Sequence, residues 1–244
     1  MSATTRGWSR ADLHLHTTHS DGRHAPQRLA AELLRSDLAV VAVTDHDTVA
    51  GALEVEECLG GEGPEVVIGA EVSSADGHIL ALFVDRDIPR GLPADATIAA
   101  IHDRGGLAVA AHPYSVSLGV GDLAAQLDFD AVEMVNGAPL MEMANARAVR
   151  RLSGTTAAGV GGSDAHVAQA VGGVHTVFLG ETAADLRAAL LAAATRPALD
   201  RGRHLAALPA HTAWLAWLLL ARRRRAESPM RGRGTPRPYD RTAL

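Results

Sequence analysis

Residues 12–22 read DLHLHTTHSDG and combine a strand pattern with a high density of metal-ligand side chains. The apolar run over residues 11–15 is typical of a buried strand. His14 and His16 stand two positions apart on it, so both imidazoles leave the same face. His19 and Asp21 follow within five residues, and imidazole and carboxylate groups both bind divalent cations. The stretch therefore predicts a strand that ends in a metal site.

Short apolar runs recur along the chain and alternate with Ala- and Leu-rich stretches of helical character. The predicted strands are 11–15, 39–44, 66–72, 78–84, 107–111, 131–135, 157–161 and 175–179. The predicted helices are 26–35, 49–59, 94–103, 140–152 and 182–194. Strands separated by such helices indicate a parallel sheet, whereas the runs on either side of SSADG, residues 73–77, predict a hairpin. With no evident linker before residue 200, the pattern favours one barrel-like α/β domain.

Further candidate ligands stand at or near the ends of these strands. Loops converge at that edge of an α/β barrel, and active sites are built there. Besides His14, His16 and Asp21, the candidates are His46, Glu71, His78, His112, Asp164 and His166. Histidines scattered through a core would not follow strand polarity. The single cysteine, Cys58, excludes a disulfide framework and a thiolate cluster, so nitrogen and oxygen atoms must hold the metal.

The composition is that of a globular protein, but the charge is distributed unevenly between the body of the chain and its last 23 residues. The 244 residues are 47% hydrophobic and 21% charged, which is typical of a folded globular protein. Residues 1–221 carry a net charge of −11, which disfavours general nucleic-acid binding, and the last 23 carry +6. We therefore expect a barrel over 8–200, a helix packed on it over 201–225, and a disordered Arg-, Pro- and Gly-rich tail over 226–244. The basic tail is a candidate contact for nucleic acid or anionic lipid.

The sequence also bears on membranes and location. The N-terminal stretch lacks the apolar core of a secretory signal. The apolar run over 205–221 is too short to cross a bilayer and contains Pro209. We expect no transmembrane segment and a cytoplasmic location, with the run forming a terminal helix; an alternative is a helix lying on an anionic membrane surface.

The ordered set DLHLHTTHSDG, TDHDT, GAEVS, HILALF, AHP and GGSDAH closely resembles the motifs of the polymerase and histidinol phosphatase (PHP) family of metal-dependent phosphoesterases. The resemblance covers roughly residues 10–180. It implies a distorted seven-stranded (β/α)7 barrel with a trinuclear site at the carboxyl ends of the strands. It also implies three divalent ions (Mn, Fe or Zn) and a metal-bridging hydroxide that attacks phosphorus.

The resemblance implies a division of the nine ligands among the three ions. The first ion is held by His14, His16, Glu71 and Asp164. Glu71 bridges to a second ion, which is held by His78 and His112. Asp21, His46 and His166 hold the third.

Four further residues are catalytic candidates. His19 and His175 are the free imidazoles that could protonate a leaving group. The favoured alternative for His19 is a position behind the ligands or facing solvent, and His175 could equally pack. Asn136 ends a predicted strand, where its amide can hydrogen-bond substrate or ligands. Arg147 is a candidate for substrate phosphate, against the alternative of a solvated helical arginine. Glu133 is either a group that orients a ligand or a buried structural acid.

Other residues and intervals have simpler interpretations. We expect His211 to be a surface or packing residue, and Trp214 and Trp217 to be core anchors of the terminal helix. The interval 83–107 is short and predicts one helix and no cap, so the site should be open.

The leading hypothesis is a metal-dependent phosphoesterase that hydrolyses a small phosphomonoester or the terminal phosphate of a nucleotide or short oligonucleotide. One alternative within the same family is histidinol-phosphate phosphatase. An alternative of another class is a non-catalytic metal-binding accessory module that docks through its basic tail.

Overall fold

One mixed sheet organises the molecule in a computed structural model that describes residues 7–116 and 118–227. The sheet has nine strands in the described part of the chain, in the order β7-β6-β5-β4-β3-β2-β1-β8-β9. The strands are β1 (Trp8–Leu15), β2 (Val40–Val43), β3 (Glu65–Ser73), β4 (His78–Leu82), β5 (Leu107–Ala110), β6 (Ala131–Asn136), β7 (Ala158–Gly162), β8 (Val174–Leu179) and β9 (Arg196–Leu199). The α-helices are α1 (Pro26–Leu33), α2 (Ala50–Leu59), α3 (Ala94–His102), α4 (Glu142–Leu152), α5 (Ala183–Leu191) and α6 (Arg201–Glu227). Two short 3-10 helices are η1 (Gly121–Ala125) and η2 (Ala168–Ala170).

Strand direction explains how ligands from different strands reach one edge. β1, β2 and β3 are parallel, as are β5, β6 and β7. β4 is antiparallel to both of its neighbours, which confirms the predicted hairpin with β3. Because Ser73 at the end of β3 pairs with His78 at the start of β4, His78 lies at the carboxyl edge of the parallel strands. Reversal of this one strand therefore brings its first residue to the site.

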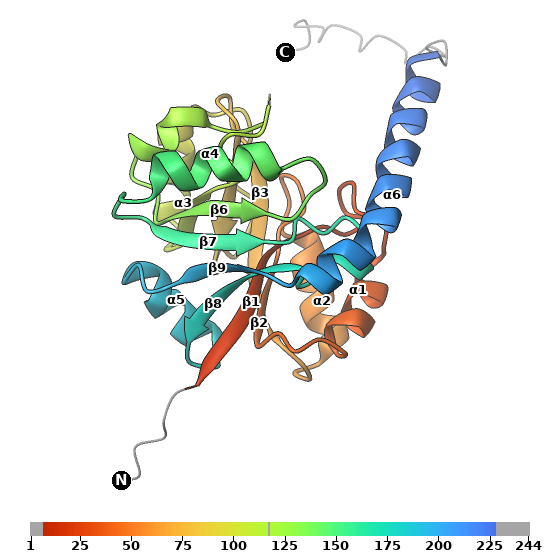
Figure 1. Cartoon of the computed structure of the whole chain (residues 1–244), viewed down its shortest axis with the longest axis horizontal. Coiled ribbons are helices and arrows are strands. Elements are labelled where there is room, and N and C mark those ends of the chain that lie inside the picture. The colour runs from red at the N-terminus through yellow and green to blue at the C-terminus, as the bar shows by residue number, and fades with distance from the viewer. Residues whose placement is uncertain (1–6, 117, 228–244) are drawn as a thin grey trace, which may run out of the picture.

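The sheet curls into a nearly closed barrel (Figure 1). Side-chain hydrogen bonds join β7 to β8: the Thr176 hydroxyl donates to the Gly161 carbonyl (2.8 Å) and accepts from its N–H (3.0 Å). At the carboxyl end, Leu15 of β1 pairs directly with Ala165, which follows β7. The first and seventh strands therefore meet where the candidate ligands lie.

The α/β barrel class is confirmed, but the strand count differs from the expected seven. β8 runs antiparallel to β1 rather than parallel, and β9 extends the sheet antiparallel to β8. β9 gives little sequence signal because it has four residues and includes Pro197. Proline lacks the N–H of a sheet ladder and is tolerated at the edge of a sheet, where β9 lies.

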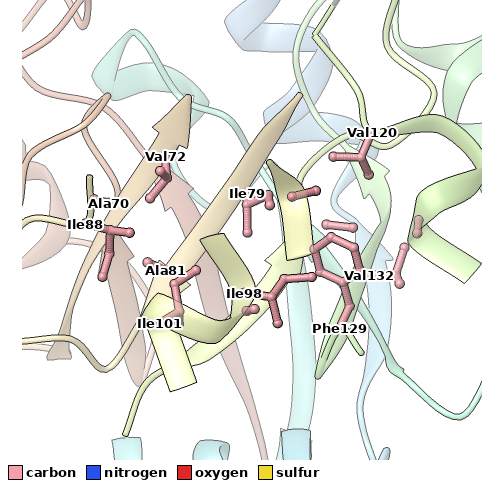
Figure 2. Packing of buried hydrophobic residues seen from close by; sticks show 14 of the residues in the cluster. Ala70, Val72, Ile79, Ala81, Ile88, Ile98, Ile101, Val120, Phe129 and Val132 are labelled. Atoms are coloured by element: carbon pink, nitrogen blue, oxygen red, sulfur yellow. The ribbon is translucent and has the colours of Figure 1, made fainter. Parts of the chain in front are cut away.

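Alternating apolar residues build two layers of core. One face of the strands fills the barrel interior, with Leu13, Val109 and Phe178 among the buried residues, and α5 contributes Leu186 and Leu190 to the same cluster. The other face packs against helices. Figure 2 shows Ile79 and Ala81 of β4 beside Ile98 and Ile101 of α3. Full burial of a side chain as large as isoleucine stabilises the fold by ~1.5–3 kcal/mol. The strands therefore form a rigid base for the polar ligands at their ends.

The C-terminal helix α6 crosses the barrel near η2 and then extends beyond the body (Figure 1). Ala207 and Trp214 are buried, whereas the Trp217 side chain is 56% exposed. The expectation of two core anchors is therefore right for Trp214 and wrong for Trp217, which is exposed although the next residue, Leu218, still packs against the core. No helix in the described ranges is both long and apolar enough to cross a membrane. Residues 228–244, most of the expected tail, lie outside the described residues.

Candidate metal centre

Glu71 lies at the middle of a cluster of imidazoles at the carboxyl end of the barrel. Its Oε2 is 3.2–3.3 Å from a ring nitrogen of three histidines, and its Oε1 is 2.7–2.9 Å from a ring nitrogen of two others. These five are His14, His16, His46, His78 and His112. Glu71 is 1% exposed, so its charge is almost entirely shielded from water.

Two aspartates extend the cluster. Asp164 Oδ1 lies 3.3 Å from His16 Nε2 and 3.3 Å from His166 Nδ1. Asp21 Oδ1 lies 3.1 Å from His166 Nε2 and 3.7 Å from His46 Nε2. The structure thus brings together all nine side chains that the sequence nominates as ligands.

The nine fall into overlapping groups whose ligand atoms lie within 4.8 Å of one another. The groups are His14 with His16 and Asp164; His14 with Glu71 and His112; His46 with Glu71 and His78; and His16 with Asp21, His46 and His166. These groups do not coincide with the division that the family resemblance implies. His16 joins the group of Asp21, His46 and His166, and His78 and His112 fall into separate groups that share Glu71.

Unpartnered buried atoms test whether these residues suit a cation. Five buried atoms form no hydrogen bond, although each lies 3.1–3.3 Å from another member of the cluster: His14 Nε2, His16 Nε2, His46 Nδ1, Asp21 Oδ1 and Asp164 Oδ1. Buried polar atoms are normally satisfied, so a concentration of orphaned lone pairs in one cluster needs an explanation. Imidazole and carboxylate donors without thiolate fit borderline-hard divalent ions. The residues present therefore fit a divalent metal centre.

The electrostatics of the cluster point the same way. Burial would lower the pKa of His16, but Asp164 and Glu71 outweigh it and raise that pKa to about 10. Burial likewise opposes ionisation of Asp21, yet His166, His16 and His46 hold the pKa of its carboxyl at about 2. The same carboxylates that hold protons on the imidazoles attract cations, so metal binding here would release protons.

Glu133 and Asn136 of β6 support the cluster from below. Glu133 Oε1 lies 3.1 Å from His14 Nδ1, and its Oε2 accepts hydrogen bonds from the N–H of His112 (2.7 Å) and from Asn136 Nδ2 (2.9 Å). Asn136 Nδ2 also donates to Asp164 Oδ2 (3.1 Å). Of the two alternatives for Glu133, the geometry matches the orienting group. Such partners fix the ring orientation and tautomer of a ligating histidine.

Two buried aspartates that sequence reasoning did not single out hold the loops of the site. Asp45 accepts hydrogen bonds from the Thr17 N–H (2.8 Å), the Thr17 hydroxyl (2.6 Å) and the Ser20 hydroxyl (2.6 Å). Gly51 makes room for Asp45, because a Cβ there would lie 1.9 Å from Asp45 Oδ2. Asp12 accepts from the N–H groups of Ser163 (2.9 Å) and Gly172 (2.8 Å). An acidic residue within or next to an otherwise apolar strand was the available signal for both.

Two candidate ligands adopt backbone conformations that favour glycine. The φ angle is 28° at His112 and 50° at Asp164. Such residues cost of the order of 1–3 kcal/mol each and cluster at functional sites. The hydrogen bonds of Glu133 to the His112 N–H and of Asn136 to the Asp164 carboxylate help to hold them there.

Of the four catalytic candidates, Asn136 contacts the ligand cluster, as described above, and the other three make their contacts elsewhere. His19 faces outward, with Nε2 2.6 Å from Glu54 Oε2. His175 lies against the Gly172 carbonyl (3.1 Å) and lines a separate surface pocket of about 370 Å³ with Arg10 and Arg196. Arg147 is exposed, and its guanidinium lies 4.5 Å from the centre of the Tyr114 ring.

The partly exposed members of the cluster mark its mouth. The side chains of His46, Asp21 and His78 are 28%, 25% and 15% exposed. Between β4 and β5 the chain forms only α3 and short connections, as expected for a site without an inserted cap.

Several known proteins are similar to this chain. A model of the family described as PHP-associated matches residues 142–195. An uncharacterized protein of Methanocaldococcus jannaschii is 39% identical over 139 residues, which cover 52% of this chain and 81% of that protein. A 5'-3' exoribonuclease of Haemophilus influenzae is 37% identical over 83 residues, 32% of this chain and only 30% of the relative.

A solved structure shares the fold. It is a two-domain protein of Bacteroides vulgatus whose name describes a predicted PHP-like metal-dependent phosphoesterase. The TM-score is 0.68 at 17% sequence identity, over 80% of this chain and 66% of that one.

Proposed function

Since this chain belongs to the PHP family of metal-dependent phosphoesterases, we propose that it hydrolyses a phosphomonoester, either of a small molecule or at the end of a nucleotide or short oligonucleotide. The observation that carries the proposal is the convergence of nine imidazole and carboxylate side chains with orphaned buried atoms. Multi-metal clusters with such ligands serve the hydrolysis of phosphate esters and of amides, and the family resemblance favours the phosphate ester.

We assign three divalent ions (Mn, Fe or Zn) to the cluster. The ligands are His14, His16, Asp21, His46, Glu71, His78, His112, Asp164 and His166. When bound, such ions supply Lewis acidity: they neutralise charge on phosphoryl oxygens and activate water as a nucleophile.

The protein's own residues prepare this site. Glu133 orients the His14 ring, and Asn136 holds the Asp164 carboxylate. Asp45 orders the loop that carries Asp21 by three hydrogen bonds to Thr17 and Ser20. Because these supports are buried, the ligands need little reorganisation when substrate binds.

The open mouth bears on the substrate. Without a cap over His46 and His78, a phosphate at the end of a longer molecule can approach the partly exposed edge of the cluster. Similarity to a relative named as an exoribonuclease supports a nucleotide terminus. Arg147, exposed on α4, is the candidate for a contact with the rest of such a substrate.

The test is phosphate release by the manganese-supplemented protein from histidinol phosphate, nucleoside 3',5'-bisphosphates and short oligonucleotides, with a chelated control. We expect chelator-sensitive turnover of one class. Asp164→Asn should abolish it, whereas Asp128→Asn, at an exposed position outside the cluster, should retain it. A metal-loaded protein that is silent across the whole panel would contradict the proposal and favour an accessory module.

A further inference from the structure

The C-terminal helix contacts the metal-ligand cluster through one buried tryptophan. Trp214 of α6 is 8% exposed, and the centre of its ring lies 4.1 Å from that of His166, with 36° between the planes. Its indole Nε1 donates a hydrogen bond to the backbone carbonyl of Asp21 (2.9 Å). One side chain therefore touches two candidate ligands, which come from opposite ends of the barrel sequence.

The two contacts restrain different degrees of freedom. His166 points Nε2 toward Asp21 Oδ1 (3.1 Å), and Trp214 covers a face of its ring. The indole N–H fixes the backbone of Asp21, from which the carboxylate extends. Together they set the approach of His166 to Asp21, two members of the group that also contains His16 and His46.

The same face of α6 carries a second polar group. His211, one turn before Trp214, is 2% exposed, and its Nε2 is buried without a hydrogen-bond partner. A helix that merely covered a core would present apolar side chains at such positions. Trp217, three residues further on, is 56% exposed and lies outside this contact.

We propose that Trp214 is a positioning residue for the group of His16, Asp21, His46 and His166, so that α6 forms part of the metal centre. The inference rests on the proposed metal-binding role of these four residues. It extends the site to a helix that begins only after the last strand of the barrel.

The first experiment measures metal content and affinity in the full chain. Wild type, Trp214→Ala, Trp214→Phe and the control Trp217→Ala are loaded with Mn²⁺ at a fixed free concentration, and the bound ions are counted and titrated. Partners behind metal ligands typically change affinity about 10- to 100-fold. We expect W214A to lower the affinity for one ion by that factor. The affinity of W214F should lie between those of W214A and wild type, and that of W217A should equal that of wild type.

These outcomes separate the inference from the proposed function. If W214A and W214F retain every ion at wild-type affinity, the positioning role is wrong while the metal centre stands. If the wild type itself binds no ion, both are wrong.

A spectroscopic measurement keeps the inference testable should W214A fail to fold. A chain with Trp8→Phe and Trp217→Phe leaves Trp214 as its single tryptophan, and paramagnetic Mn²⁺ bound beside His166 should quench its emission. The matched chain with Trp8→Phe and Trp214→Phe should show much weaker quenching. Emission from Trp214 that does not change while Mn²⁺ binds would overturn the inference.

Discussion

Glu133→Gln should weaken metal binding although Glu133 belongs to none of the ligand groups. The carboxylate receives hydrogen bonds on both oxygens: the His14 ring faces Oε1, and the His112 N–H and Asn136 Nδ2 face Oε2. An amide has one oxygen to replace the two. Each hydrogen bond to a charged acceptor contributes ~1.5–3 kcal/mol, so the amide oxygen should keep the side with two donors.

That orientation turns the amide NH₂ toward His14 Nδ1. The ring must then accept at Nδ1 and carry its proton on Nε2, the atom that faces Glu71 and Asp164. A protonated Nε2 cannot bind a cation. Loss of such a partner typically costs about 10- to 100-fold in metal affinity, which is ~1.4–2.7 kcal/mol.

The assay is calorimetric titration of metal-free protein with Mn²⁺, beside a count of bound ions. Glu57→Gln is the matched control, because Glu57 is exposed on α2 and belongs to no ligand group. Wild-type affinity in a folded E133Q protein would refute the tautomer argument.

Three further experiments test the ligands, His211 and the basic tail. Asp164→Asn or His16→Ala should abolish chelator-sensitive phosphate release in protein that circular dichroism shows to be folded, because each removes a candidate ligand; retained turnover in both variants would contradict the ligand assignment. Burial lowers the pKa of His211 to about 4, so the folded state resists protonation of this ring. The free energy of unfolding should therefore fall by up to roughly 3 kcal/mol as pH drops from about 6.5 to about 4. His211→Phe should flatten this pH dependence in urea unfolding, and an equally steep curve for the variant would contradict the prediction. Deletion of residues 222–244 should leave turnover intact, whereas an accessory module would lose its partner in a pull-down with RNA or anionic vesicles.

The sequence was most informative where local pattern and chemistry coincide. His14 and His16 could be placed on one strand face because a strand repeats every two residues. Glu71 and His78 could be brought together because a short polar segment between apolar runs indicates a hairpin, and the structure pairs those strands antiparallel. Strand polarity then placed the remaining ligands at one edge.

Features that depend on residues far apart in the chain could not be predicted from the sequence. Asp12 and Asp45 stand inside the quoted motifs, but only the fold shows that they bind loop N–H and hydroxyl groups. Helical spacing predicted the same environment for Trp214 and Trp217, but only Trp214 is buried, because the fold decides which side of α6 meets the barrel. Likewise, the sharing of His16 between two ligand groups depends on angles between strands.

The pairing of Leu15 with Ala165 also sets an order of events during folding. His14 and Asp164 are 150 positions apart, so the ligands that they supply meet only after a very long loop has closed. Closure of such loops has an entropic cost, and contacts of this separation slow folding. During synthesis, the amino-terminal strands emerge long before residues 164–166. A chain at that stage already carries most of the imidazoles but lacks the enclosing geometry, so we expect the proposed metal centre to fill only in the last steps of maturation.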